Sequence, residues 1–141
     1  MLVELREYSS AEEIAEKLDK EIGDTKSMLG NYLNKLDKIR TLAEKSKRIR
    51  ELVIKLSGKK MSNDTLGEIE IGNLNIILDA TPWHELTAID SVVRSLQERL
   101  LVLQKARESM RPLDQLGDTE GVRYVVLEND GVPERILFKT S

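Results

Sequence analysis

The chain has 141 residues and a formal net charge of −3, with 33% charged and 4% aromatic residues. This length suits one domain with a modest core, and the balanced charge excludes a global signal for a polyanionic partner. Cysteine is absent, which excludes disulfides and thiolate metal sites, and abundant Glu, Lys and Arg without cysteine is a composition found in thermophiles. With no apolar run of about 18 residues and no signal-peptide pattern at the start, we expect a cytoplasmic protein that is not inserted in a membrane.

The start of the chain predicts a short acidic helix. Residues 1–8 alternate enough for a strand, or they lead into a helix, and the pattern leaves both open. Ser10–Glu13 fits a capping box, which predicts a helix over residues 10–22. Residues 23–25 can end this helix and cap the next one. The alternative is one unbroken helix over Ser10–Ser57, because a single glycine costs only about 1 kcal/mol.

Residues 25–57 predict a long helix of about 50 Å. Apolar or small side chains recur at steps of three or four residues along one stripe: Leu29, Tyr32, Leu36, Ile39, Leu42, Ser46, Ile49, Val53 and Leu56. Two consecutive steps of three around Ile39 form a stammer, where we expect local overwinding. A helix of this length needs a partner for its stripe.

The polar face of this long helix is mostly basic, since residues 35–60 hold ten Lys or Arg against three acids. One interpretation is a solvated face with weak ion pairs, or a face covered by the acidic residues 1–24. The other is a surface that follows phosphates, although no aromatic side chains are interleaved to stack on bases. The candidate nucleic-acid contacts are Lys47, Arg48, Arg50, Lys55, Lys59 and Lys60.

Residues 67–79 predict a β-hairpin. Two short apolar runs flank Gly72 and Asn73, a glycine-first pair typical of type II′ or I′ turns. Pairing Ile71 with Leu74 then places the apolar side chains of both strands on one face.

A second long helix of about 45 Å is predicted over residues 82–111, with Thr81 as its N-cap and Pro82 in its first position. Its stripe follows a heptad register with one charged position: Leu86, Ile89, Val93, Leu96, Leu100, Leu103, Arg107 and Met110. Pro112 ends the helix. From this stripe, Leu96, Leu100 and Leu103 are candidate contacts to another helix or subunit.

The C-terminal part predicts a linker and a second hairpin. Residues 113–120 form the linker, and residues 122–139 form the hairpin around Asn129–Gly131. Pro133 lies at the margin of that turn and favours an edge position for its strand.

Candidate chemistry is sparse. His84 lies near Asp79 and Glu85, but no second histidine completes a metal motif, so a structural role at the helix start is favoured. Trp83, the sole tryptophan, either packs the first hairpin on the helices, which we favour, or forms an exposed hot spot for a partner. No catalytic, cofactor or metal site emerges, and no general base lies near Ser9 in the sequence.

Together these elements predict one α+β domain, residues 1–141, built on an antiparallel pair of long coiled-coil-like helices with two β-hairpins and a short N-terminal helix. A helical pair with a hairpin at its tip resembles prefoldin in outline over about residues 25–111, which implies a chaperone-like role; the second hairpin departs from that pattern. We expect a non-enzymatic module that oligomerises, with a dimer favoured, and binds protein partners. Deleting residues 122–141 should then weaken association, because we expect the hairpins to complete a sheet between chains. The alternative is a nucleic-acid-associated protein.

Overall fold

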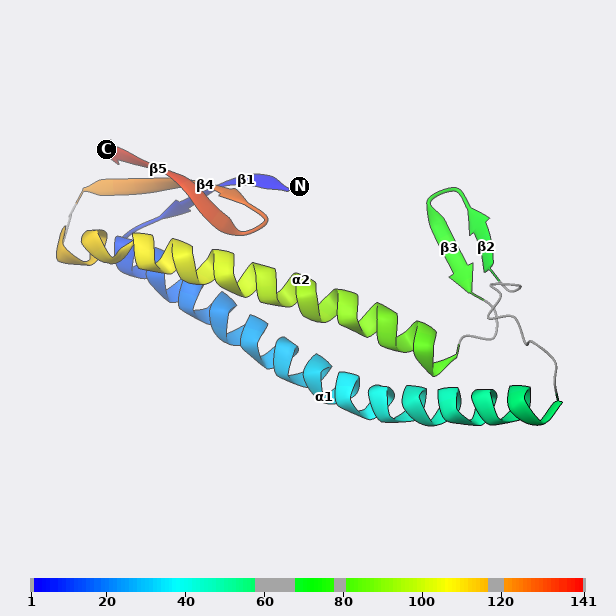
Figure 1. Cartoon of the computed structure of the whole chain (residues 1–141). Coiled ribbons are helices and arrows are strands. Elements are labelled where there is room, and N and C mark those ends of the chain that lie inside the picture. Colours follow the sequence, from blue (N-terminus) through cyan, green and yellow to red (C-terminus); the bar gives the residue numbers. More distant parts are fainter. Residues whose placement is uncertain (1, 58–67, 78–80, 117–120, 141) are drawn as a thin grey trace. The chain divides into compact units, whose positions relative to one another are not determined.

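A computed structural model describes residues 2–57, 68–77, 81–116 and 121–140. Its elements, in chain order, are β1 (Val3–Tyr8), α1 (Ala11–Ser57), β2 (Glu68–Ile71), β3 (Leu74–Ile77), α2 (Pro82–Ser109), a 3₁₀ helix (Arg111–Leu116), β4 (Val122–Asn129) and β5 (Val132–Thr140) (Figure 1). The α+β class is confirmed, with two helices and two small antiparallel sheets. The chain divides into two compact units, Met1–Leu29 with Ser95–Ser141, and Gly30–Arg94.

The first unit contains a three-stranded antiparallel sheet in the order β1-β4-β5. The start of the chain is therefore a strand, and β1 pairs with β4 of its own chain, so that Tyr8 lies opposite Tyr124. The second hairpin is thus joined by β1 of its own chain, which corrects, for this hairpin, the expectation that the hairpins complete a sheet between chains. Pro133 lies in the edge strand β5 as predicted. Beside it is a register shift, so that no residue of β4 lies opposite Glu134 in the strand pairing.

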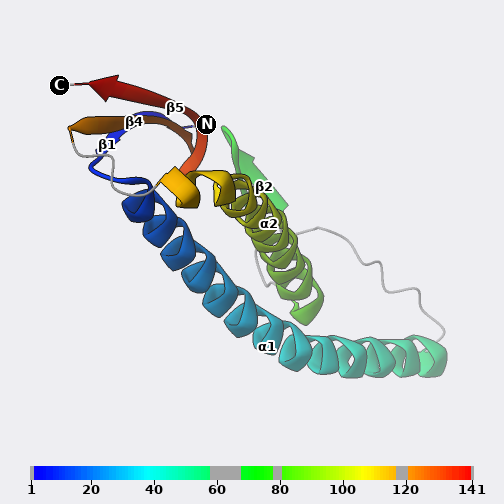
Figure 2. The ribbon, with the colours of Figure 1, turned by 90° about the vertical axis from the view of Figure 1, so that its left-hand side faces the viewer.

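One face of this sheet packs against the first turns of α1 and the last turns of α2, as Figure 2 shows. The core consists of Tyr8, Ala11, Ile14, Leu18, Leu103, Met110, Tyr124 and Val126. Its members on β4 are two residues apart, as they must be to share one face of a strand, and those on α1 follow helical spacing. The core of this unit thus joins the two ends of the chain.

The helix α1 begins with a modified capping box. Ser10 acts as the N-cap, because its Oγ accepts a hydrogen bond from the backbone N–H of Glu13 at 3.1 Å. The Glu13 carboxylate does not return to Ser10 but accepts from the N–H and the Oγ of Ser9, at 2.9 and 2.6 Å. The predicted helix start is confirmed, with the reciprocal bond shifted by one residue.

The predicted break at residues 23–25 does not occur, and the alternative of one unbroken helix is confirmed, because α1 runs over 47 residues from Ala11 to Ser57. The buried Thr25 does not cap a new helix, because its hydroxyl donates to the carbonyl of Glu21 at 2.7 Å inside the continuing helix. This stretch runs antiparallel to α2 in the first unit, where Arg107 pairs with Asp19 at 3.0 Å and Arg99 with Glu21 at 3.4 Å. Packing against α2 outweighs the weak helix-breaking tendency of one glycine.

In the second unit, the buried stripe of α1 continues through Leu36, Ile39 and Ala43. The predicted stammer is wrong: Leu42 is 54% exposed, and the step after Ile39 is four residues, which keeps a regular heptad register. Beyond Ala43, no described side chain of α1 is buried. The two long helices were predicted to have similar lengths, about 50 and 45 Å. In the structure α1 has 47 residues and α2 has only 28, which corrects this prediction.

Both predicted hairpins are present. In the first, Ile71 pairs with Leu74, and Gly72 has φ of +61° while Asn73 keeps a negative φ, as in a type II′ turn. In the second, Asp130 and Gly131 both have positive φ, as in a type I′ turn. The turn residues, together with the short apolar runs that flank them, were sufficient to predict these two elements.

Candidate interaction surfaces

His84 serves the start of α2. The backbone N–H of Thr81 donates to His84 Nδ1 at 3.1 Å, and the Thr81 hydroxyl lies 2.9 Å from the same nitrogen. His84 thus occupies the third helical position and does what Glu does in a capping box. Asp79, its proposed neighbour, lies outside the described residues. Among the residues that the structure describes, no three His, Cys, Asp or Glu side chains gather as metal ligands.

A buried charged cluster lies beneath the sheet of the first unit. Glu128 on β4 is 2% exposed and accepts hydrogen bonds from Tyr8 Oη at 2.6 Å and from Lys17 Nζ at 2.9 Å. Arg6 Nε lies 3.3 Å from the same carboxylate. These partners satisfy the buried charge and connect β1, α1 and β4. The cluster is filled by its own members, so we interpret it as structural.

Ser9 and Glu13 form the nearest approach to a nucleophile and a base, which the sequence analysis missed. Hydrogen bonds from the Ser9 hydroxyl and the Ser9 backbone N–H hold the pKa of Glu13 below its usual value of 4.5. A carboxylate with a lowered pKa is a weaker base. We therefore interpret the pair as part of the cap of α1.

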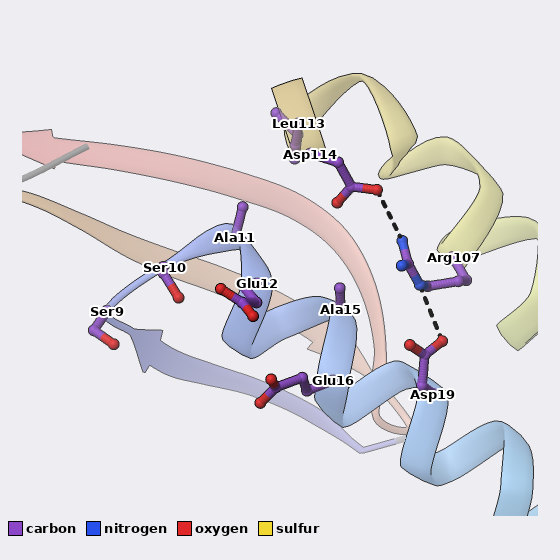
Figure 3. Close-up of a pocket in the computed structure, with 10 residues that line it drawn as sticks. All are labelled: Ser9, Ser10, Ala11, Glu12, Ala15, Glu16, Asp19, Arg107, Leu113 and Asp114. Carbon is purple, nitrogen blue, oxygen red and sulfur yellow. Dashed lines mark hydrogen bonds and ion pairs between the residues drawn. The ribbon is translucent and has the colours of Figure 1, made fainter. Parts of the chain in front are cut away.

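A groove of about 700 Å³ lies beside this cap, between the start of α1 and the 3₁₀ helix (Figure 3). Arg107 lies between Asp19 and Asp114, with Nη1 at 3.6 Å from the Asp114 carboxylate. The other charged residues of its lining, Glu12 and Glu16, are acidic. The cation of this lining, Arg107, is thus paired with Asp19 through its Nε, whereas its buried Nη1 has no hydrogen-bond partner in the described part of the chain.

The other face of the three-stranded sheet carries exposed apolar side chains among charged ones, and in the described part of the chain no helix covers it. Its residues alternate with those of the helix-covered face and are Val3, Leu5 and Glu7 on β1, Arg123, Val125, Leu127 and Asn129 on β4, and Arg135, Leu137 and Lys139 on β5. We call this the outer sheet face. On the central strand, Val125 is buried among its neighbours, at 9% exposure. Leu5 is 66% exposed and Leu137 is 47% exposed, although both lie beside the apolar residues of β4. An exposed apolar patch of this kind makes the outer sheet face a candidate interaction surface.

This outer sheet face was not predicted, although the sequence holds a signal for it. The run Tyr124–Leu127 is apolar at four consecutive positions, which is typical of a strand covered on both faces. In the structure, only the face bearing Tyr124 is covered by helices.

A second exposed apolar surface lies on α1 in the second unit. Leu42, Ile49, Leu52 and Leu56 fall within about 80° of one another on the helix and are all exposed. Three of them, Leu42, Ile49 and Leu56, were predicted to lie in the helical seam, and their exposure corrects that prediction. We call these four exposed residues the distal stripe of α1. Lys45 lies within the same angular range, so the surface is both apolar and basic.

The candidate nucleic-acid contacts divide into three groups. Lys47, Arg48 and Lys55 are exposed, fall within about 100° on α1, and form no ion pair with the residues that the structure describes. Glu44 and Glu51 lie four residues before Arg48 and Lys55, a spacing that favours weak ion pairs, but these pairs do not form. Arg50 is half-buried on the opposite side from Arg48. Lys59 and Lys60 lie outside the described residues.

The candidate partner contacts also differ in exposure. Leu96 and Leu103 are buried and Leu100 is half-buried, so the heptad stripe of α2 is used within the chain. Trp83 is 64% exposed, and the favoured interpretation that it packs the first hairpin is wrong. It remains available as a contact for a partner.

Comparisons with known proteins identify no relative: no family model, no curated protein and no solved structure matches the chain. The outline resemblance to prefoldin therefore stays an expectation. No helix in the described part of the chain has both the length and the apolar character needed to cross a membrane.

Proposed function

We propose that the protein is a non-enzymatic module that self-associates, with a dimer favoured, and binds other proteins in an assembly, adaptor or chaperone-like role. The observation that carries this proposal is the outer sheet face, where Val3, Leu5 and Leu137 are exposed on a sheet whose other face packs against the helices. Burial of apolar surface is the main favourable term in protein association. The cytoplasmic location expected from the sequence is part of this proposal.

Partner binding is supported by the distal stripe of α1. Its leucine and isoleucine side chains are exposed at helical spacing, and Lys45, Arg48 and Lys55 lie within or beside them. An apolar helical face with basic margins suits an acidic amphipathic segment of another protein.

The test of self-association uses two exposed leucines. Leu5→Asp places a charge on the outer sheet face without touching the core, and it should convert the associated protein into a folded monomer in sedimentation velocity. Leu101→Asp is the matched control, because Leu101 is 57% exposed on α2 away from that face, and it should leave the association unchanged. Equal behaviour of the two variants would contradict the assignment.

The second candidate function is nucleic-acid binding through Lys47, Arg48 and Lys55, which is favoured because these side chains form no ion pair with any described residue. Binding should weaken steeply with salt and show little base preference, because phosphate contacts carry no sequence information. Replacing Arg48 and Lys55 together by Glu should abolish the retention of an oligonucleotide at low salt, whereas Arg94→Glu on α2 should not. Unchanged affinity in the double variant would exclude this surface.

A further inference from the structure

We propose that two copies of this chain pack their outer sheet faces together about a two-fold axis oblique to the strands, with Glu7 of each copy facing Arg135 of the other. The inference rests on the proposed self-association and specifies its occupant and geometry. It is carried by the positions of the two charges on the outer sheet face.

The strand register fixes where these charges lie. Two neighbouring rows of the outer sheet face cross the three strands, the first formed by Leu5, Leu127 and Arg135, the second by Glu7, Val125 and Leu137. Neighbouring strands are about 4.8 Å apart, and residues two apart on one strand are separated by about 6.8 Å. Glu7 and Arg135 therefore occupy opposite corners of an otherwise aliphatic rectangle, on the two edge strands.

Only one orientation of a two-fold axis in the plane of the interface satisfies both charges. An axis parallel to the strands places Glu7 over Leu137 of the second copy, and an axis perpendicular to them places Glu7 over Leu5. Both arrangements bury a carboxylate against a leucine, which is costly. An axis perpendicular to the Glu7–Arg135 diagonal places each Glu7 against the opposite Arg135.

The same oblique axis also brings the aliphatic residues together. It places Leu5 near Leu127 of the second copy, and Val125 near Leu137. With the spacings above, the strands of the two sheets cross at about 70°, which is close to the orthogonal class of sheet packing. Because a two-fold interface repeats every contact, the Glu7–Arg135 pair forms twice.

The charges on this surface are suited to a second copy. Glu7 and Arg135 are exposed, and neither forms an ion pair within the described residues. Arg123 and Lys139 share the next row beyond Glu7, so the oblique pairing leaves them at the periphery. Edge-to-edge pairing is less suited, because Pro133 and the bulge interrupt the β5 edge.

A charge-swap experiment tests this geometry. Sedimentation equilibrium of the full chain should show that Glu7→Arg and Arg135→Glu each weaken the dimer about tenfold or more, because like charges then face each other. The double variant should recover most of the affinity. Lys139→Glu is the control on the same strand and face, and it should leave the dimer unchanged; circular dichroism confirms that each variant is folded.

The outcomes separate this inference from the proposed function. If the chain dimerises and neither single variant weakens the dimer, or the double variant is no better than the singles, the oblique geometry is wrong although self-association stands. If two copies instead paired edge to edge through β1, Arg135→Glu would leave the dimer unchanged, because Arg135 lies on β5 at the opposite edge of the sheet. If the unmodified chain is a monomer, the proposed self-association fails as well.

Discussion

At the residue scale, the first unit depends on one buried carboxylate. Glu128 lies under the sheet and is held by Tyr8, Lys17 and Arg6, which come from β1 and α1. A buried charge is tolerated only when its partners and hydrogen bonds are in place, so this contact defines how the two ends of the chain fit together. No local sequence signal predicts it, because Tyr8 and Glu128 are 120 positions apart.

This cluster predicts a loss of stability at alkaline pH. Burial, together with the hydrogen bond to Glu128, raises the pKa of Tyr8 above its usual 10.0. For Lys17, burial lowers the pKa, but the interactions with Tyr8 and Glu128 outweigh it, so its pKa lies above 10.5. Both groups hold their protons more tightly when folded, so their contribution is complete below about pH 10 and is lost as pH rises through the raised pKa values.

Urea unfolding at a series of alkaline pH values measures this effect. The free energy of unfolding should fall above about pH 10, and Tyr8→Phe should remove part of the fall because that variant has no phenol to ionise. A free energy that stays flat in this range, or a slope unchanged by Tyr8→Phe, would show that the cluster is not formed.

At the element scale, local chemistry accounts for most of what the sequence predicted. The Gly72 and Asp130–Gly131 turns require positive φ, Ser10 caps α1, and His84 accepts from the N–H of Thr81 at the start of α2, so hairpins and helix starts follow from a few residues. Three points required tertiary information. These are the continuity of α1 past Gly23, the choice of Ala43 over Leu42 for the seam, and the pairing of β1 with a strand more than a hundred residues away.

The corrected seam predicts a large loss of stability on truncating one leucine and almost none on truncating another, six residues further along α1. Leu36→Ala should reduce the free energy of unfolding by about 2–5 kcal/mol, because it removes a buried side chain and leaves a cavity. Leu42→Ala should change it by less than about 0.5 kcal/mol, since Leu42 is exposed. Chemical denaturation measures both free energies of unfolding. A large loss of stability from Leu42→Ala would show that Leu42, and not Ala43, lies in the seam between the helices.

At the scale of the whole molecule, the outer sheet face is the feature that the sequence analysis could least foresee. Its residues come from both ends of the chain and form one surface only after β1 joins β4. The basic side chains of α1 and the exposed Trp83 were visible in the sequence because they are local features. The structure adds that three of these basic residues share one side of the helix, whereas Arg50 does not.

The central claim is that the outer sheet face is an interface between copies of this chain. Sedimentation equilibrium of the unmodified protein across a range of micromolar concentrations tests it most directly. The account predicts a reversible approach to twice the single-chain mass of 16.0 kDa. A folded protein that keeps the single-chain mass at every concentration would contradict it.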